Sequence, residues 1–465
     1  MLHQFELFEK CFAYDSESGA LLRLDEISAA VLQLFRAHEG QRPSEAELAQ
    51  LARRYSLDFS ELKETADDFE QLIAEEYLFH PEHHLTLAEL YPDGPKFKAM
   101  CLNICHDCNM RCTYCFAGTG DYGHERSMMS YETGCQAIDF LVRESGKRRN
   151  LDIDFFGGEP LLNWPVVKDL VYYCREIEKR SGKNLRLTLT TNCSLLSEEK
   201  IKFINEHFAN VVLSIDGREK IHDKMRPFTG GRASHQFIVD KIRRFVELRG
   251  DKSYYLRGTF TAHNLDFAED VFALAELGAQ VSLEPVVAPP ELDYSIGPQH
   301  LEQIKREYER LGKLLSESEL RGENINFFHF NIYLQGGPCL YKRAKGCGVG
   351  TEYCAVTPTG DIYPCHQLVG EEQFILGNVA TVAEEGLRSD YLGLFKRLLL
   401  PDKDACRACW ARYFCSGGCA ANAYFACGDP DAISEINCEL QKKRLEVSLW
   451  LENERRERRE MRDHA

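Results

Sequence analysis

The distribution of cysteine constrains this chain most. Of 19 cysteines, six fall within residues 101–135 and ten within residues 339–438, while only Cys11, Cys174 and Cys193 lie elsewhere. An odd number of cysteines in a chain long enough to bury a hydrophobic core argues against a framework of disulfides. Metal binding or catalysis explains such clusters better. They divide the chain into a cysteine-poor head, a middle region and a cysteine-rich tail.

Composition and charge exclude several classes of function. The formal net charge of −17 argues against a protein that binds the phosphate backbone of nucleic acids. The sequence has no run of about 18 apolar residues, so a transmembrane helix is not expected. Residues 1–6 lack the basic and apolar regions of a signal peptide. We therefore expect a cytoplasmic protein with neither a nucleic-acid nor a membrane partner.

The head, residues 1–90, is predicted to be a small separate domain. Its strand candidates, which surround a turn cluster, are residues 5–8, 11–14, 20–24 and 77–79. Three amphipathic helices are expected between the third and fourth of these, the second beginning with a capping box of Ser44 and Glu47. Helices with a β-hairpin suggest a winged-helix-like domain. Because the head is not basic, it is expected to serve packing or to bind a peptide at an exposed strand edge.

The middle region, residues 96–325, alternates strands with helices. The strand candidates are Phe97–Ile104, Leu151–Phe156, Leu185–Thr191, Asn210–Ile215, Tyr254–Thr261 and Gln280–Pro285. Six such units predict an α/β fold with a parallel sheet covered by helices. Six units are too few to close an eight-stranded barrel, so an open, partial (β/α)6 barrel is expected. Ligands of such folds bind at the C-terminal ends of the strands.

Three cysteines follow the first predicted strand with C-x3-C-x2-C spacing: Cys108, Cys112 and Cys115. Three thiolates on one tight loop can hold three irons of a 4Fe–4S cluster and leave the fourth iron open to a non-protein ligand. Zinc fits such a loop poorly, because structural zinc sites use four protein ligands. Cys101 and Cys105 fall outside the spacing and are predicted to be packing residues.

Candidate ligand-binding residues stand at the ends of the later strands. Gly157, Gly158 and Glu159 follow the second strand. Glycine lets the backbone approach a ligand closely, and a carboxylate accepts hydrogen bonds from an ammonium group. Asn192 stands at the end of the third strand, Ser214 and Asp216 at the end of the fourth, and Val286 and Val287 after the sixth. Two further candidates are Arg226, twelve residues beyond Ser214, and Arg257, within the fifth strand. The common position at strand ends favours one site over separate roles as turn, cap or surface ion pair.

The tail, residues 330–440, has little periodicity and is expected to consist of loops and turns around metal sites. Its cysteines are Cys339, Cys347, Cys354, Cys365, then Cys406, Cys409, Cys415 and Cys419 with C-x2-C-x5-C-x3-C spacing, and finally Cys427 and Cys438. One or two zinc ribbons are an alternative interpretation. Residues 441–465 are predicted to form a helix that ends in a solvated run of charges.

The cysteine loop, with Tyr114 before its last cysteine, resembles that of the radical S-adenosylmethionine enzymes. The resemblance implies that its three cysteines hold a 4Fe–4S cluster whose open iron binds S-adenosylmethionine, and that reductive cleavage then yields a 5′-deoxyadenosyl radical. It assigns the amino group of this ligand to the Gly157-Gly158-Glu159 motif and the carboxylate to Arg226. It places the ribose at Ser214 near Asp216 and adenine at Val286 and Val287, with Asn192 and Arg257 as weaker candidates.

The tail resembles the SPASM extension of radical enzymes that modify peptides, which carries two auxiliary 4Fe–4S clusters. The resemblance assigns the second to Cys406, Cys409, Cys415 and Cys438, and the first to Cys347, Cys365 and Cys419, with Cys339 as the candidate fourth ligand. If Cys339 does not ligate, the first auxiliary cluster keeps an open iron that a substrate thiolate can occupy. Three clusters in all are implied, and Cys354 and Cys427 are expected to be structural.

Longer stretches, among them Asp154–Pro160, Tyr254–Phe260 and Gly360–Gln367, resemble the maturases of six-cysteine peptides, the SCIFF and ranthipeptide thioether synthases. This resemblance implies a head that binds the leader of a ribosomally made, cysteine-rich precursor. It also implies a reaction that joins cysteine sulfur to a carbon of an acceptor residue, and an external electron donor of the flavodoxin or ferredoxin type.

Two alternatives stay open. Anaerobic sulfatase-maturating enzymes place an aspartate base directly after the cysteine of their G-x4-C element, where this chain has His366, itself a candidate base. A non-catalytic zinc-cluster scaffold is the other alternative, and it would leave the motifs at the strand ends without a purpose.

Overall fold

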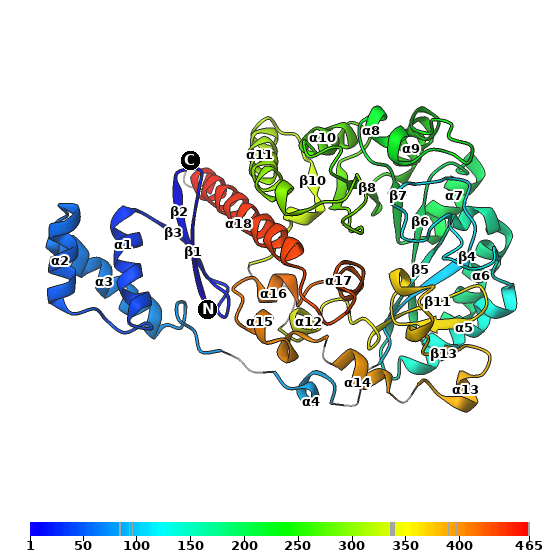
Figure 1. The fold of residues 1–465 in the computed structure, drawn as a ribbon, viewed down its shortest axis with the longest axis horizontal. Helices are drawn as coiled ribbons and strands as arrows, with labels where there is room; N and C mark the ends of the chain where they lie inside the picture. The colour runs from blue at the N-terminus through cyan, green and yellow to red at the C-terminus, as the bar shows by residue number, and fades with distance from the viewer. Residues whose placement is uncertain are drawn as a thin grey trace.

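The computed structural model describes residues 1–82, 85–92, 94, 96–334, 340–388, 390–396 and 398–463, so Cys339 lies outside the described residues. Within them the strands form one ten-stranded and one three-stranded sheet. Figure 1 shows the large sheet and its helices at one side of the molecule, the head at the other, and the long helix α18 (Glu435–Asp463) between them. No helix among these residues combines the length and apolar character needed to cross a membrane.

The middle region forms the parallel part of the large sheet, in which six strands alternate with helices as predicted. They are β4 (Ala99–Cys105), β5 (Asn150–Gly157), β6 (Asn184–Thr191), β7 (Asn210–Ser214), β8 (Tyr255–Phe260) and β9 (Gln280–Pro285), and β10 (Asn326–Phe327) adds to β9. The helices are α5 (Tyr131–Glu144), α6 (Trp164–Ser181), α7 (Glu198–His207), α8 (Glu219–Met225), α9 (His235–Arg249), α10 (Ala268–Ala275) and α11 (Leu301–Leu320).

Only one face of this sheet is apolar. Leu185, Leu187 and Leu189 of β6 are buried, whereas the residues between them are half-buried or exposed, and β5 and β8 show the same alternation. Side chains alternate between the faces of a strand, so the helices cover the apolar face and polar side chains line the other. The carboxyl ends of the strands, and this polar face, hold the candidate site. The curvature of a partial barrel stays a prediction.

The tail differs from the predicted loops. Its strand β11 (Tyr353–Val356) pairs in parallel with β4, and β12 (Asp361–Tyr363) and β13 (Gly377–Asn378) continue the sheet in antiparallel order. The prediction of loops alone is wrong because the buried segment Cys354–Val356 adds to the sheet beside β4. The short tail helices are α12 (Leu340–Lys345), α13 (Val382–Glu385), α14 (Tyr391–Lys396), α15 (Asp404–Arg407), α16 (Arg412–Cys415) and α17 (Ala420–Cys427).

The head has a three-stranded antiparallel sheet followed by helices. Its elements are β1 (Leu2–Leu7), β2 (Lys10–Asp15), β3 (Leu21–Leu24), α1 (Glu26–Ala37), α2 (Glu45–Tyr55) and α3 (Phe59–Ala74), with the short α4 (Leu87–Leu90) after it. The capping box of Ser44 and Glu47 begins α2, as predicted. The strand predicted at residues 77–79 is not formed, because positive φ angles of 62° at Glu76 and 52° at Phe79 interrupt an extended chain.

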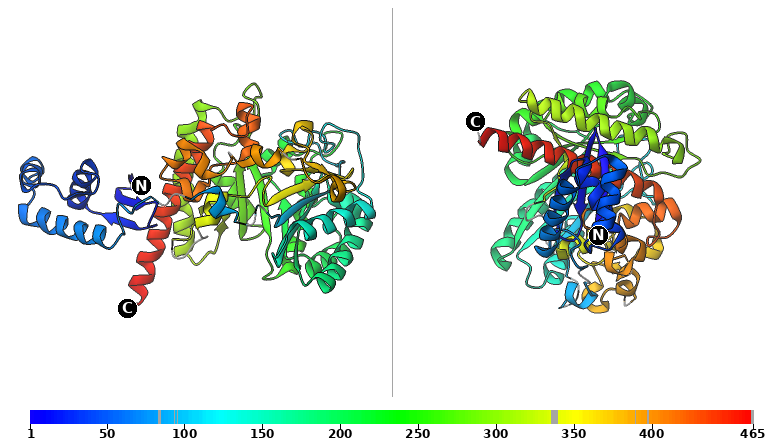
Figure 2. Two further views of the ribbon diagram at one scale, coloured as in Figure 1. Left: turned by 90° about the horizontal axis from the view of Figure 1, so that it is seen from below. Right: turned by 90° about the vertical axis from the view of Figure 1, so that its left-hand side faces the viewer.

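The head sheet packs on both of its faces. Ala13 and Leu24 belong to a core shared with the head helices. Phe5, Phe12 and Tyr14 instead belong to the main hydrophobic core of the molecule. Figure 2 shows the head helices extending outward while the head strands lie beside α18. The head sheet is therefore joined to the remainder of the molecule by packing as well as by the chain.

Candidate functional site

The predicted cysteine loop follows β4 and is docked on the segment after α8. The backbone N–H of Arg111 donates to the carbonyl of Pro227 at 2.8 Å. Burial raises the pKa of Cys108 to about 12, and negative charge on Cys112 and Cys115 adds to this. Burial also raises the pKa of Cys112 and Cys115, so all three predicted ligands lie on one loop in a buried environment.

The two glycines after β5 position this loop. Gly157 has a φ of 123°, and a Cβ added at Gly158 would lie 2.0 Å from the carbonyl oxygen of Asp107. Only glycine allows such an approach of two backbones. The close contact that the sequence indicated is therefore with the chain just before Cys108, and it fixes the loop against the sheet.

Glu159 and Asn192 tie two strand ends to the loop. The carboxylate of Glu159 is buried and accepts hydrogen bonds from the backbone of Asn192 at 2.7 Å and from the hydroxyl of Thr191 at 2.8 Å. Burial raises the pKa of Glu159. The amide of Asn192 donates to Asn109 at 2.9 Å and contacts the sulfur of Cys108 at 3.7 Å. The carboxylate of Glu159 is thus engaged by the end of β6 and the turn after β5, and its role in binding the amino group of a ligand stays a prediction.

Tyr114, Asp216 and Arg226 form a second group beside the loop. The Tyr114 hydroxyl donates to Asp216 at 2.5 Å, and the Arg226 guanidinium lies 3.8 Å from Asp216. The buried Nε of Arg226 has no hydrogen-bond partner in the described part of the chain. An unpaired buried donor is costly, and a ligand carboxylate would supply its acceptor. The donor set therefore fits the carboxylate of an amino acid.

An apolar patch adjoins this group. Met225, Val286 and Tyr294 form a small buried cluster against which Tyr114 packs. Val287 is half-buried beside it. Such a patch suits a flat ring such as adenine. The sequence analysis missed Met225 and Tyr294, and the only signal for Met225 was its position next to Arg226.

Arg257 occupies a different place. It lies opposite Ser214 across β7 and β8. Burial raises the pKa of Asp154 to about 7, and the positive charge of Arg257 opposes this. Burial likewise lowers the pKa of His366 to about 4, with Arg257 contributing. Arg257 is exposed on the face of β8 opposite the buried Leu256 and Gly258, in register with Ser214, and its charge acts on both Asp154 and His366.

His366 connects the tail to the cysteine loop. Its Nδ1 lies 2.8 Å from the hydroxyl of Tyr353, and its ring contacts those of Phe156 at 5.1 Å and Phe116 at 5.7 Å between centroids. Phe116 directly follows Cys115, and His366 directly follows Cys365. Two predicted cluster-binding segments thus meet through neighbouring side chains.

The first predicted set of tail cysteines comes together. Burial raises the pKa of Cys365, and the neighbouring thiolates of Cys419 and Cys347 raise it further. Cys354 is buried in β11, outside this set.

The second predicted set is grouped in the same way. Burial raises the pKa of Cys415 to about 11, and the charges of Cys438, Cys406 and Cys409 add to this. Cys427 is exposed and outside this set. Within the described residues, no three metal-ligating side chains converge closely enough to hold a single ion. A 4Fe–4S cluster takes each cysteine at a different iron, so these wider groups fit its donor chemistry.

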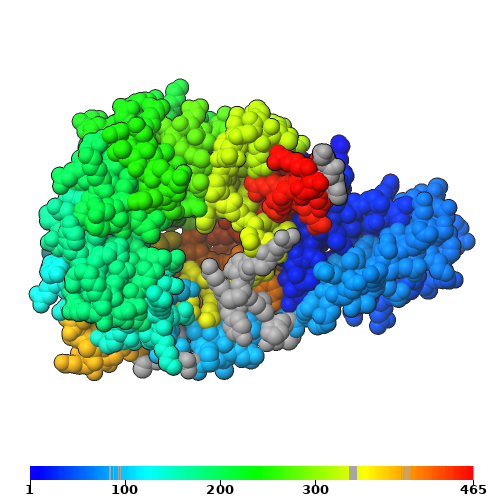
Figure 3. Space-filling model, turned by 180° about the vertical axis from the view of Figure 1, so that it is seen from behind, coloured from blue at the N-terminus to red at the C-terminus, as the bar shows by residue number. Residues whose placement is uncertain are grey.

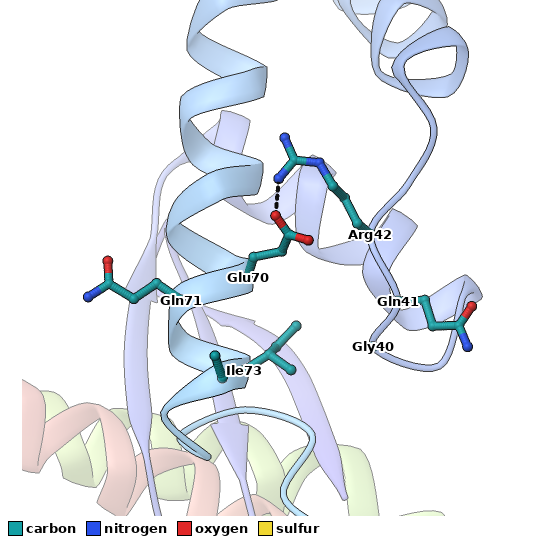
Figure 4. Close-up of a pocket in the computed structure, with 7 residues that line it drawn as sticks. Gly40, Gln41, Arg42, Glu70, Gln71 and Ile73 are labelled. Atoms are coloured by element: carbon teal, nitrogen blue, oxygen red, sulfur yellow. Dashed lines mark hydrogen bonds and ion pairs between the residues drawn. The ribbon is translucent and has the colours of Figure 1, made fainter.

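Figure 3 shows a hollow beside the middle region, which is green, and dark orange residues of the tail form the floor of this hollow. Another depression lies in the head between the turn at Gly40–Arg42 and α3 (Figure 4). There Arg42 is paired with Glu70 and with Asp67, the latter at 2.6 Å. The charges that line the head depression are thus neutralised within it.

Comparison with known protein families agrees with this arrangement. Residues 102–275 match the model of the radical SAM superfamily, and residues 347–410 match SPASM, an iron–sulfur cluster-binding domain. The chain therefore contains a radical SAM domain followed by a SPASM domain, and it is an enzyme of this class. The first domain implies S-adenosylmethionine and a 4Fe–4S cluster, and the second implies auxiliary iron–sulfur clusters.

Several known proteins are similar over most of the chain. A cysteine-type anaerobic sulfatase-maturating enzyme of Clostridium perfringens is 27% identical over 341 residues, which cover 67% of this chain and 85% of that protein. The structure of anSMEcpe with bound AdoMet covers 77% of this chain and 94% of its own, with a TM-score of 0.62 and 19% identity. Streptococcus suis SuiB bound to precursor peptide SuiA covers 92% and 96%, with a TM-score of 0.53 and 16% identity. These two structural likenesses establish the fold alone.

Proposed function

We propose that this enzyme forms thioether crosslinks in a ribosomally made, cysteine-rich precursor peptide, joining cysteine sulfur to a carbon of an acceptor residue. The contact between His366 and Phe116 carries the proposal, because these residues follow cysteines of two different predicted clusters. A peptide lying on the polar face of the sheet would reach both segments at once. This geometry suits a reaction that takes a hydrogen atom at one place and binds a sulfur at the other.

The cofactors supply the radical chemistry: S-adenosylmethionine, reduced by one electron, provides the group that abstracts a hydrogen atom. Cys108, Cys112 and Cys115 would hold the first cluster. The unpaired Nε of Arg226 would donate to the carboxylate of S-adenosylmethionine, and the patch around Val286 would hold its adenine. Two auxiliary clusters would be held by the two tail sets.

The residues of the chain orient the peptide and handle its proton. Joining sulfur to carbon removes two hydrogens from the peptide, so the thiol proton needs an acceptor and one electron must leave. His366 is held by Tyr353 on the polar face, within reach of both cluster segments. Burial lowers the pKa of this imidazole to about 4, so it is neutral and would relay the proton onward but not retain it. An external carrier of the flavodoxin or ferredoxin type would exchange the electrons.

The head would bind the leader of the precursor. Among the described residues β3 pairs only with β2, so its other edge is open to an added strand. The match with SuiB covers so much of this chain that it extends into the head. This supports a head that belongs to peptide-modifying enzymes of this architecture.

Sulfatase maturation is the second candidate function. The Clostridium perfringens relative, aligned over two thirds of this chain, favours it. Against it stands His366, since the resemblance to that family implies an aspartate at this position.

Anaerobic reconstitution with iron and sulfide, followed by incubation with a cysteine-rich peptide encoded nearby, tests the proposal. Thioether formation predicts a product lighter by two hydrogens per bond, with thiols that no longer react with alkylating agents. Conversion of one cysteine to an aldehyde would instead establish sulfatase maturation. A protein that retains zinc and gives no reaction would indicate that the chain is a non-catalytic zinc-cluster scaffold.

A further inference from the structure

The head sheet is docked on the loop that carries the second set of tail cysteines. The ring of His3, in β1, stacks on Trp410 with 3.9 Å between centroids and an interplanar angle of 3°. Trp410 directly follows Cys409. One edge of the head sheet therefore rests on the chain between two members of that set.

A buried ion pair reinforces this contact. The side chains of Glu17 and Arg412 are each only 3% exposed, and Arg412 Nε donates to Glu17 at 3.1 Å. The hydroxyl of Tyr413 donates to the other carboxylate oxygen, also at 3.1 Å. Arg412 further pairs with Glu82 at 2.9 Å, in the connection that leaves the head. Removing one partner of a buried pair leaves an uncompensated charge, so these groups hold each other firmly.

Helix α18 provides a third attachment. His3 is 3.1 Å from Glu446, and Arg23 is 2.8 Å from Glu457. Lys10 pairs with Glu454, and the ring of Phe8 meets Trp450 edge-on at 4.6 Å. The same helix carries Cys438. Figure 1 shows the head strands beside this helix.

We propose that these contacts fix the head to the SPASM domain, so that the enzyme selects precursors by the number of residues between the leader and the modified cysteine. This inference rests on the proposed function, in which the leader binds the head. A fixed head sets a constant distance from the leader to the polar face of the sheet. A chain spans at most about 3.5 Å per residue, so a spacer below a minimum length fails to reach.

The length dependence is therefore asymmetric. Below the minimum the effective concentration of the substrate cysteine falls to near zero. Above it, each doubling of a flexible spacer costs only about 0.6 kcal/mol, which is roughly a threefold loss. If the head were joined only by a mobile connection, it could move towards the polar face of the sheet when the spacer is short. Crosslinking would then show no sharp minimum spacer length.

The test uses the full, reconstituted enzyme and precursors with spacers shortened or lengthened by about two, four and six residues. For the native chain we expect crosslinking to drop more than tenfold below one spacer length and to decline gradually above it. Glu17→Gln should move this threshold to shorter spacers while leaving the affinity for a fluorescent leader peptide unchanged. Arg42→Gln, which breaks the ion pair with Glu70 inside the head (Figure 4), is the matched control and should keep the native threshold.

A second variant protects the test if Glu17→Gln fails to fold. Lys10→Ala removes a partly exposed attachment of β2 to Glu454 and Glu457 of α18 and should also move the threshold. Hydrogen exchange of residues 406–415 should rise in both variants and not in Arg42→Gln. An unchanged threshold in the loosened variants, or no threshold in the native chain, overturns the inference while leaving crosslinking itself intact. Failure of the leader to bind the head would instead remove both the inference and the proposed role of the head.

Discussion

The guanidinium of Arg226 donates a hydrogen bond to the hydroxyl of Tyr114 at 3.0 Å, and the Tyr114 hydroxyl in turn donates a hydrogen bond to Asp216. This chain of donors joins the end of α8, the cysteine loop and the end of β7. It holds the guanidinium in place while its Nε stays without a partner among the described residues. The arrangement is preorganised for an anionic ligand beside the loop.

Arg226→Lys is expected to weaken the binding of S-adenosylmethionine. Lysine lacks the planar fork of donors, and a lost hydrogen bond to a charged group costs about 1.5–3 kcal/mol, or roughly tenfold to a hundredfold in Kd. Anaerobic calorimetry on the reconstituted enzyme measures this. Arg232→Lys, whose guanidinium lies over the ring of Phe228 outside this group, is the control. Equal affinity in the Arg226 variant would remove Arg226 from the ligand site.

Cys415→Ala is expected to lower the iron content by one cluster. Three 4Fe–4S clusters contain about 12 iron atoms, so the variant should retain about eight if its site no longer assembles. Cys427→Ala serves as the comparison, since Cys427 is exposed and lies outside both tail sets. Colorimetric iron analysis after reconstitution measures the difference. Full iron in the Cys415 variant would show that the grouping of these thiols has another purpose.

Asp154→Asn is expected to stabilise the apoprotein at neutral pH. Burial raises the pKa of Asp154 from 3.8 to about 7, so the native state keeps a proton that the unfolded state releases. The stability linked to this proton is complete below pH 3.8 and is lost as the pH rises to about 7. The neutral asparagine avoids this loss, which is roughly 2–4 kcal/mol. Denaturant titrations should therefore show that the free energy of unfolding of the variant exceeds that of the native protein by an amount that grows between pH 4 and pH 7. A difference independent of pH would refute the raised pKa of Asp154 as its cause.

Gly158→Ala is expected to destabilise the fold and displace the cysteine loop. Its Cβ would meet the backbone oxygen of Asp107 at 2.0 Å, and backbone cannot rotate away as a side chain can. A cost of roughly 2 kcal/mol or more follows. Gly393→Ala, where nothing lies within 4 Å, should be neutral or stabilising by up to about 1 kcal/mol. Chemical denaturation distinguishes the two, and similar unfolding midpoints would contradict the close approach.

The local features of this fold could be predicted from the sequence. Apolar alternation located β9 at the residues observed, and the capping box located the start of α2. The strand expected at residues 77–79 failed because local backbone conformation at Glu76 and Phe79 overrides its apolar composition. These successes and this failure all concern interactions between residues close in sequence.

Features that depend on distant residues could not be predicted. The pairing of β11 with β4 joins segments some 250 residues apart, and the sequence of neither segment indicates with which strand it pairs. Arg257 of β8 stands in register with Ser214 of β7, and whether it contacts the sulfonium ligand stays a prediction. The family resemblance divided the tail cysteines into two sets, and their role as cluster ligands stays a prediction.

The release of 5′-deoxyadenosine tests the central claim most directly. The reconstituted native enzyme, given S-adenosylmethionine, dithionite and precursor, should release 5′-deoxyadenosine in proportion to the crosslinks formed. Cys112→Ala, which removes one sulfur of the loop after β4, should release essentially none. Crosslinked peptide from the Cys112 variant at the native rate, or crosslinks formed without 5′-deoxyadenosine, would contradict the account.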